Sequence, residues 1–473
     1  MEPIKTEIVV VGAGPGGYTA AFYAADKGKK VTLVEQNPRL GGICLNSGCI
    51  PSKALLHATE ILREVKDSAA RGIDFLEPKI DLEKLRAWKE SILERLGQGI
   101  NGLAQKRGVQ IIHGRGHFED SRTLRVETTE GQKFVSYEKA IIAVGSKPAM
   151  PSAFDLGNKR IMTSTEALDI QDVPDDFLVV GGGYIGMELG TVYADLGSKV
   201  VVLEAMPSIL TGVDPDLVRP VSRAAQKSFK EIRVNTKVLK MATAGKQIRV
   251  TMEIDKQQRE ELYDQVLVSV GRVPNYADLG LENTGVTKDD KGFIKCNPQQ
   301  QTEDPDIYAI GDVNGGTLLA HRASKEARIA VEALLGESSA FANIVIPAVV
   351  YTRPEVAWCG LTETEAKEKN IDVKVAKFLW GASGRALTLD RTDGLTKLII
   401  EPSSERILGV GIVGVHAGEL IAEGVLAIEM GATARDVASS VHPHPTLSET
   451  LMEAAETFYG TATHTLTARR ASV

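Results

Sequence analysis

One pattern occurs twice in this chain, and it constrains the fold more than any other feature. Its first copy consists of the apolar run Glu7–Val11, the glycine turn Gly12-Ala-Gly14-Pro-Gly-Gly17, a stretch of small residues from Tyr18 to Lys27, and a second apolar run, Val31–Val34, that ends on Glu35. Strand, glycine turn, helix, strand and terminal acid together are the fingerprint of a dinucleotide-binding unit. The glycines let backbone N–H groups at the helix N-terminus meet a pyrophosphate. We expect Glu35 to accept hydrogen bonds from a ribose.

The second copy of the pattern lies 169 positions later and has the same internal spacing. It consists of the run Phe177–Val180, the turn Gly181-Gly-Gly183-Tyr-Ile-Gly186, a helical stretch to Leu196, and the run Val200–Leu203 that ends on Glu204. The first glycine precedes the acid by 23 positions in both copies. A single glycine-rich turn is weak evidence, because such turns also serve packing alone. Two complete units predict two dinucleotide sites.

The second acid also bears on the choice between NAD and NADP. A carboxylate at this position hydrogen-bonds a free ribose 2′-hydroxyl and repels a 2′-phosphate. The residues after Glu204, Ala205 to Ser208, contain no arginine that could bind a 2′-phosphate. We therefore predict NAD for the second unit.

Length and composition limit the number of domains and the kinds of binding partner that the protein can have. The 473 residues suggest about three domains, at roughly 150 residues each. The formal net charge of −7 argues against nucleic-acid binding, which requires basic patches. The N-terminus resembles neither a secretory signal nor a transit peptide, and no stretch approaches the ~18 apolar residues of a membrane span. We expect a cytoplasmic protein, or an organelle-matrix protein whose presequence has been removed, with no membrane partner.

Two of the four cysteines, Cys44 and Cys49, stand five positions apart in a glycine-rich segment. Cytosolic disulfides are usually catalytic or redox-sensing. Pro51 favours the start of a helix here, and a helix N-terminus lowers the pKa of a nearby thiol. Two unrelated buried cysteines and a zinc half-site are the alternatives, but neither explains the glycines. Cys296 and Cys359 stand alone and form no second pair for a zinc tetrad.

The segment around this pair carries a resemblance to a known family. Residues 41–56, which include the tail Ile-Pro-Ser-Lys-Ala-Leu-Leu, resemble the redox-active disulfide segment of the FAD-dependent disulfide oxidoreductases, and the tail is most similar to the dihydrolipoamide dehydrogenase branch. The resemblance covers essentially the whole chain and implies FAD and NAD as cofactors. It also implies that Cys44 is the interchange thiol that meets substrate, and that Cys49 lies against the flavin.

The same resemblance assigns further site residues. It implies that Lys53 lies near the flavin with Glu188 as its ion-pair partner, although single charges are usually plain surface charges. The stretch 302–312 resembles a second FAD motif, which implies that Asp312 meets the ribityl and pyrophosphate end. The remaining cofactor contacts that the resemblance implies are Gly42, Gly116, Gly145, Tyr184, Val238, Gly271 and Ala320.

A histidine near the C-terminus is the candidate base. The segment His442-Pro-His444-Pro-Thr-Leu-Ser-Glu449 supplies an imidazole, which titrates near neutral pH, and an acid five residues later. His444 and Glu449 match the family's catalytic histidine and its orienting carboxylate, whereas His442 matches no family role. A proline-rich loop with surface histidines is the alternative reading. By resemblance, the C-terminal domain forms a homodimer and His444 serves the disulfide of the other subunit.

We therefore predict an α/β protein with two Rossmann-like dinucleotide-binding domains and a C-terminal α+β dimerisation domain. The expected segments are an FAD domain over 1–150, an NAD domain over 151–278, a return segment of the FAD domain over 279–345 and a dimerisation domain over 346–473. Within the last, strands are expected at 398–400 and 410–413 and an amphipathic helix from His416 to Met430. The implied activity is oxidation of protein-bound dihydrolipoamide with reduction of NAD, and the implied partners are the lipoyl domains of 2-oxoacid dehydrogenase or glycine cleavage complexes.

Several positions depart from the family pattern or bear on rival functions. Ile43 replaces a usual threonine, and Tyr184 stands where glutathione reductases carry a tyrosine that covers the nicotinamide site, so we expect it to gate the flavin here. One rival function is that of glutathione reductase, which prefers NADPH. Two others are those of mercuric reductase and thioredoxin reductase, but both enzymes carry C-terminal redox residues that residues 468–473 lack. The last rival is a non-enzymatic scaffold. A scaffold would not require Cys44, Cys49 and His444 together.

Overall fold

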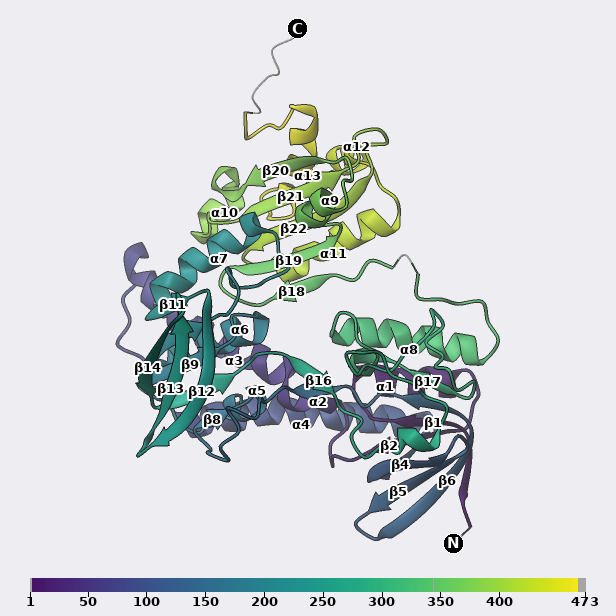
Figure 1. The fold of residues 1–473 in the computed structure, drawn as a ribbon. Helices are drawn as coiled ribbons and strands as arrows, with labels where there is room; N and C mark the ends of the chain where they lie inside the picture. Colours follow the sequence, from purple (N-terminus) through teal and green to yellow (C-terminus); the bar gives the residue numbers. More distant parts are fainter. Residues whose placement is uncertain (1, 343, 467–473) are drawn as a thin grey trace.

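The chain forms three bodies in a computed structural model, which describes residues 2–342 and 344–466 (Figure 1). One body carries the N-terminal sheet, a second carries the sheet built around β9 and β10, and the third lies at the C-terminal end of the chain. The C-terminal stretch 468–473, which helped to set the rival reductases aside, lies outside the described residues. None of the helices in the described ranges combines the length and apolar character needed to cross a bilayer.

The first body is built on a seven-stranded sheet in the order β3-β2-β1-β6-β5-β4, with β17 paired to β6. Its strands are β1 (Ile4–Val11), β2 (Val31–Glu35), β3 (Gln110–His113), β4 (Arg115–Asp120), β5 (Thr123–Thr128), β6 (Gly131–Ile142) and β17 (Ile307–Ala309). Its helices are α1 (Pro15–Asp26), α2 (Gly42–Ser47), α3 (Cys49–Ser68), α4 (Leu82–Lys106) and α8 (Ala320–Leu334), with 3₁₀ turns at Ala69–Arg71, Leu281–Asn283 and Gly311–Asn314. The continuous apolar runs of β1 and β2 become buried parallel strands, as expected for a sheet covered on both faces.

The second body repeats this plan in a smaller, five-stranded sheet of order β11-β10-β9-β15-β8. Its elements are β8 (Ile161–Met162), α5 (Ser164–Ala167), β9 (Asp176–Val180), α6 (Tyr184–Leu196), β10 (Lys199–Leu203), α7 (Pro215–Ser228), β11 (Glu231–Arg233) and β15 (Gln265–Val268). A three-stranded antiparallel sheet packs beside it, formed by β12 (Thr236–Ala244), β13 (Gln247–Ile254) and β14 (Gln257–Tyr263). The chain enters and leaves this body through β7 (Ser146–Pro148) and β16 (Arg272–Pro274), which pair antiparallel.

The third body is α+β, with an antiparallel sheet of order β18-β19-β22-β21-β20. Its elements are β18 (Ala348–Val350), β19 (Glu355–Gly360), α9 (Glu363–Glu368), β20 (Lys374–Leu379), the 3₁₀ turn Trp380–Ala382, α10 (Gly384–Leu389), β21 (Leu395–Ile400), β22 (Ile407–Gly414), α11 (Ala417–Glu429), α12 (Ala434–Ser439) and α13 (Glu449–Tyr459). The predicted strands at 398–400 and 410–413 and the predicted helix 416–430 are confirmed as β21, β22 and α11. The fold class is therefore confirmed.

The strands of the three main sheets come from separate parts of the chain. Only β17, from the predicted return segment, goes back to the first sheet. The predicted boundaries at 150, 278 and 345 all fall between sheets. The division into four segments remains our proposal.

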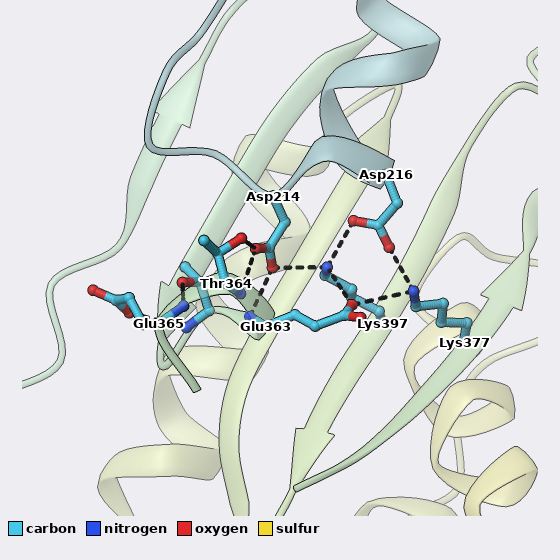
Figure 2. A network of polar contacts seen from close by, with 8 residues as sticks. Asp214, Asp216, Glu363, Thr364, Glu365, Lys377 and Lys397 are labelled. Atoms are coloured by element: carbon cyan, nitrogen blue, oxygen red, sulfur yellow. Dashed lines mark hydrogen bonds and ion pairs between the residues drawn. The ribbon is translucent and has the colours of Figure 1, made fainter. Parts of the chain in front are cut away.

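A cluster of charges around the buried Lys397 joins the second body to the third (Figure 2). The Lys397 side chain on β21 is only 1% exposed, and its ammonium lies 2.7 Å from a carboxylate oxygen of Asp214 and of Asp216, at the start of α7. Asp214 also accepts hydrogen bonds from the backbone N–H groups of Glu363 and Thr364, and so caps α9 from another body. Asp214, Asp216 and Glu363 lie close enough to hold a metal ion, but the Lys397 ammonium already supplies the positive charge among them. The cluster therefore serves as a connection between domains.

Candidate active site and cofactor clefts

The two glycine turns have matching geometry at their first, second and third glycines. Gly12 and Gly181 adopt left-handed φ angles of +100° and +106°. A Cβ atom on either would lie 2.4 Å from the carbonyl oxygen of Ala143 or 2.5 Å from that of Ser269. Glycine is therefore required at the first position of each turn.

The third glycines of the two turns, Gly17 and Gly186, pack against the first. A Cβ there would lie 1.8 Å from the carbonyl oxygen of Gly12 and 2.1 Å from that of Gly181. The second glycines, Gly14 and Gly183, are different, because a Cβ on Gly183 would meet nothing within 4 Å and one on Gly14 only Gly42, at 3.9 Å. The first and third glycines thus shape the turn, and the second leaves room beside it.

Each turn leads into a helix whose N-terminus is left free for an anion. Gly14 and Gly183 are the N-cap residues of α1 and α6, neither helix has a side-chain cap, and neither has an acidic residue in its first turn. The unpaired N–H groups of a helix N-terminus favour phosphate. Both helices therefore suit a pyrophosphate.

The strand-end acids occupy matching positions above the turns. The carboxylate of Glu35 accepts hydrogen bonds from the N–H groups of Ala13, at 2.7 Å, and Asn37, at 2.9 Å. The carboxylate of Glu204 accepts from the N–H groups of Gly182, at 2.6 Å, and Met206, at 2.7 Å. Each acid thus ties its strand end to its own glycine turn and lies where the ribose of a bound dinucleotide is expected.

One cavity of about 290 Å³ gathers most of the predicted site residues. The predicted residues that line it are Gly12, Gly14, Glu35, Gly42, Cys44, Cys49, Lys53, Gly116, Gly145, Tyr184, Glu188, Asp312 and Ala320. The cavity begins at the first glycine turn, where the free N-terminus of α1 suits the pyrophosphate of FAD, and extends to the thiol pair, where a flavin must react. The residues present therefore fit FAD.

The thiol pair joins two consecutive helices inside this cavity. Cys44 lies in α2, Cys49 is the first residue of α3, and both are free thiols. Donating a hydrogen bond to Cys49, together with burial, raises the pKa of Cys44 above its ordinary value. Accepting that bond, together with the positive charge of Lys53, lowers the pKa of Cys49 to about 7 although burial opposes it. Cys49 is therefore the thiol that ionises first, and the separate roles of the two cysteines stay a prediction.

Lys53 and Glu188 form the predicted ion pair. The Lys53 ammonium lies 2.7 Å from a carboxylate oxygen of Glu188, whose side chain is 4% exposed. Glu188 also accepts hydrogen bonds from the Ser52 hydroxyl, at 2.9 Å, and from the backbone N–H of Tyr351, at 3.0 Å. The Tyr351 ring lies under the ammonium, 4.5 Å from Nζ to the ring centroid. The pair is thus a positioned, largely buried group rather than a pair of plain surface charges.

Sequence reasoning missed three residues that extend this site. Arg272 donates from Nε to the Ser146 hydroxyl, at 2.7 Å, and from Nη2 to the Ser146 carbonyl, at 2.8 Å, while the Ser146 hydroxyl donates to Asp312 at 2.5 Å. Tyr351 is the third, through its ring under Lys53. Arg272 and Ser146 adjoin Gly271 and Gly145, which the sequence did single out, so the motif was found but its polar members were not.

The predicted base lies in the third body, apart from the cavity. His444 hydrogen-bonds through Nδ1 to a carboxylate oxygen of Glu449 at 2.9 Å, and its side chain is 72% exposed. Although burial opposes it, hydrogen bonds from the Thr446 N–H and from His444 hold the pKa of Glu449 below its ordinary value. Neither His444 nor Glu449 lines the cavity around Cys44. This arrangement suits a base that acts on another subunit.

The remaining predicted residues lie outside the cavity lining. Gly17, Gly181 and Gly186 shape the turns described above, Gly183 leaves room beside the second turn, and Glu204 bonds that turn. Gly271 lies at the start of the return crossing with φ of +134°. Val238 is 8% exposed and packs into the apolar core that β12 shares with the second sheet. A cofactor contact at Val238 or Gly271 stays a prediction.

Comparisons with known proteins extend over nearly the whole chain. Residues 6–327 match the pyridine nucleotide-disulphide oxidoreductase family, and residues 346–455 match the dimerisation domain of the same family. The chain is 44% identical over 461 residues to the dihydrolipoyl dehydrogenase of Vibrio cholerae serotype O1, covering 97% of each chain. It is 43% identical over 464 residues to the dihydrolipoyl dehydrogenase of Geobacillus stearothermophilus, covering 98% of each.

Solved structures share the fold of this chain. LpdA from Mycobacterium tuberculosis superposes with a TM-score of 0.88 at 26% identity, over 96% of this chain and 99% of that one. The Cu(II) complex of the HOCl-induced flavoprotein disulfide reductase RclA from Escherichia coli superposes with a TM-score of 0.86 at 27% identity, over 97% of this chain and 100% of that one. Both superpositions cover nearly the whole of this chain, so the fold is shared across all three bodies.

Proposed function

This chain belongs to the pyridine nucleotide-disulphide oxidoreductases, and from that premise we propose that it oxidises dihydrolipoamide to lipoamide through Cys44 and Cys49 and passes the electrons to NAD. It is an FAD- and NAD-dependent enzyme, as its family and relatives are. The observation that carries the proposed roles is the thiol pair itself. Cys49, with a pKa of about 7, heads α3 beside Lys53, in the same cavity as the first glycine turn.

The thiol chemistry begins with a disulfide between Cys44 and Cys49. One thiol of the substrate loses its proton to the His444 Nε2 of a partner subunit, and the resulting thiolate attacks the Sγ of Cys44. The Cys44–Cys49 bond breaks and Cys49 leaves as a thiolate, a good leaving group because of its low pKa. The second substrate thiol then attacks the mixed disulfide, releases lipoamide and leaves Cys44 protonated. Two electrons have moved from the dithiol to the cysteine pair.

The neighbouring residues hold charge in place during these steps. Lys53 stabilises the Cys49 thiolate, and Glu188 holds Lys53 in position from its buried site. Glu449 orients the His444 ring through Nδ1, which leaves Nε2 as the proton acceptor. Bound in the cavity, FAD supplies the two-electron chemistry that connects the thiol pair with NAD. Gly12, Gly14, Gly42, Gly145 and Asp312 are the residues that would hold it.

We propose that the active enzyme is a homodimer in which each cavity is completed by the partner's His444. The match to the family's dimerisation domain over 346–455 supports this. The position of His444, exposed and outside its own chain's cavity, supports it as well. One consequence is that a mixed dimer of Cys44→Ser and His444→Gln chains should keep about half of the wild-type sites, because one site contains neither defect and the other contains both.

We further propose that the dithiol is carried by the lipoyl domain of a 2-oxoacid dehydrogenase or glycine cleavage complex. The similarity to dihydrolipoyl dehydrogenases supports a lipoyl substrate but does not choose among complexes. The cytoplasm is the proposed compartment, because a cysteine pair that must be reduced and reoxidised suits a reducing environment.

The test is formation of NADH from dihydrolipoamide and NAD by the purified FAD-loaded enzyme, with NADP and reduced glutathione as parallel alternatives. We expect turnover with dihydrolipoamide and NAD only, and its loss in Cys44→Ser. No activity with dihydrolipoamide, but oxidation of NADPH with another disulfide, would overturn the proposed substrate. Retained binding to a lipoyl-bearing complex by Cys44→Ser would separate catalysis from any scaffolding role.

A further inference from the structure

The loop that carries the candidate base contains a second histidine whose side chain points the opposite way. Within residues 440–448, Val441 is 97% exposed and the His444 side chain is 72% exposed, but the His442 side chain is only 6% exposed. Pro443 separates the two histidines. A polar ring that is turned inward between exposed neighbours needs hydrogen-bond partners inside.

Both ring nitrogens of His442 have such partners. Nδ1 lies 2.8 Å from the carbonyl oxygen of Ser440, at the end of α12, and Nε2 lies 2.7 Å from a carboxylate oxygen of Glu423, in the middle of α11. A carbonyl only accepts, so Nδ1 carries a hydrogen, and one further proton is shared between Nε2 and Glu423. The bond to Glu423 is therefore charge-assisted, the stronger class of hydrogen bond.

The far end of the same loop is fastened independently of His442. The Thr446 hydroxyl donates to the Pro443 carbonyl at 2.7 Å, and the Thr446 N–H donates to Glu449 at 2.8 Å. Glu449 is the first residue of α13 and also holds the His444 ring. The loop is thus held on both sides of His444. On one side His442 bonds Glu423 of α11 and Ser440 at the end of α12, and on the other side Thr446 bonds Glu449 of α13.

We propose that His442, through Glu423, is a positioning residue that fixes the direction of the His444 imidazole toward the dithiol of the substrate. The inference rests on the proposed function, since it assigns a role within that reaction. Neither His442 nor Glu423 contacts the reacting atoms. Their effect is on geometry, and a small misplacement of a catalytic group costs up to about a hundredfold in rate.

The test separates the two halves of the reaction. Oxidation of free dihydrolipoamide by NAD needs the base, whereas reduction of ferricyanide by NADH uses the cofactors without it. The variants are His442→Ala, Glu423→Ala, the double variant, and the conservative Glu423→Gln, whose amide N–H can donate to Nε2 while Nδ1 still donates to the Ser440 carbonyl. His117→Ala is the matched control, because that ring also bonds a backbone carbonyl, at 3.0 Å, but lies in the first body.

We expect His442→Ala and Glu423→Ala each to lower kcat for dihydrolipoamide about ten- to a hundredfold, with an unchanged KM for NAD and unchanged ferricyanide reduction. The double variant should be no worse than the worse single one, because the two residues act as a unit. Glu423→Gln should recover most of the activity, and His117→Ala should equal wild type.

Three outcomes would overturn the inference. They are wild-type dihydrolipoamide turnover in His442→Ala and Glu423→Ala, a parallel fall of both reactions, and additive losses in the double variant. Glu423 has a side chain that is 38% exposed, so its variants should fold even if His442→Ala does not. If the wild-type enzyme itself fails to oxidise dihydrolipoamide while reducing ferricyanide, the proposed function has failed and with it this inference.

Discussion

The two dinucleotide units start from the same turn and diverge in what the chain does after the strand-end acid. In the first unit the chain continues from Glu35 into α2 and α3, and Gly42 comes so close to Gly14 that a Cβ on Gly42 would lie 2.5 Å from the Gly14 Cα. In the second unit the chain leaves Glu204 for the loop before α7, and the space beside Gly183 stays open. The loops after the two acids both bond their turns, through Gly41 to Ala13 and through Leu210 to Gly182, but only the redox segment also comes up against the second glycine. We call the first unit the closed unit and the second, where a Cβ on Gly183 meets nothing within 4 Å, the open unit.

This difference matches the cofactors that we propose for the two units, FAD for the closed unit and NAD for the open one. FAD remains bound through the cycle, which suits a unit closed by a second layer of chain. NAD must enter and leave at every turnover, which suits a unit with an open turn.

The largest effects on cofactor binding should come from replacing the first glycine of each turn, one turn at a time. Gly12→Ala and Gly181→Ala place a Cβ 2.4 and 2.5 Å from a carbonyl oxygen at φ near +100°, which costs roughly 1–3 kcal/mol in backbone strain before any clash. We expect Gly12→Ala to weaken FAD binding at least about tenfold, and Gly181→Ala to keep FAD but raise the KM for NAD by a similar factor. Flavin content and NAD saturation curves measure the two effects.

Gly102→Ala is the control for these two variants. Gly102 lies within α4, and a Cβ there would meet nothing within 4 Å. Alanine should therefore be neutral or slightly stabilising at this position. Loss of flavin from Gly181→Ala would show that the two units do not act separately.

The next largest effect is expected at Glu204, the strand-end acid of the open unit. Glu204→Ala removes a carboxylate that holds the N–H groups of Gly182 and Met206 and is expected to bind the ribose. Hydrogen bonds to a charged group contribute about 1.5–3 kcal/mol, so we expect the KM for NAD to rise about tenfold or more. The KM for NADP should change less, because the repulsion of the 2′-phosphate is also removed. An unchanged ratio of kcat/KM for NAD and NADP would contradict the assignment of Glu204 as the residue that selects NAD.

The features that the sequence predicted well are local. Both glycine turns, both strand-end acids and the helix that begins at Cys49 depend on residues within a few positions of one another. Their backbone conformations follow from the absence of a Cβ and from proline near the helix start. They could therefore be placed before any three-dimensional contact was known.

The features that the sequence did not predict are contacts between distant segments. Arg272 reaches Ser146 only because β16 pairs with β7, and Tyr351 reaches Lys53 only because the third body packs on α3. A lysine in an apolar run, such as Lys397, gives no sign at sequence level that it will be buried among carboxylates from two other elements. His442 and His444 share one proline-rich loop, and nothing in that loop says which ring turns inward. Such contacts depend on packing between bodies, which periodicity and spacing do not encode.

A smaller effect concerns the thiol pair, which exists only in the closed unit. Lys53→Met removes a cation that lowers the pKa of Cys49 and leaves the Glu188 charge, which raises it. Both changes favour the thiol, so the pKa of Cys49 should rise from about 7 by about one unit or more. Near pH 7 the thiolate fraction of the reduced enzyme should then fall severalfold and recover at higher pH.

Thiolate absorbance at 240 nm of the reduced enzyme, taken as a difference from Cys49→Ser, measures this titration. Lys53→Arg keeps a cation and should titrate close to wild type. The double variant Lys53→Met with Glu188→Gln removes both charges and should fall between. A titration that is unmoved in Lys53→Met would show that the hydrogen bond from Cys44 alone sets the pKa of Cys49.

The smallest expected effect is at Tyr184, one of the α6 residues that line the cavity of the closed unit. Tyr184 is the first residue of α6, directly after Gly183, yet its ring lines the cavity of the closed unit and is 41% exposed. An aromatic ring at that place can cover the nicotinamide side of the flavin until NAD displaces it. Contacts of such a ring amount to about 0.5–1.5 kcal/mol, so Tyr184→Val should lower the KM for NAD only about two- to tenfold and raise the rate of flavin oxidation by oxygen. Tyr184→Phe keeps the ring and should resemble wild type. If Tyr184→Val changes neither NAD binding nor oxygen reactivity, the ring does not gate the flavin, and NAD binds without first displacing it.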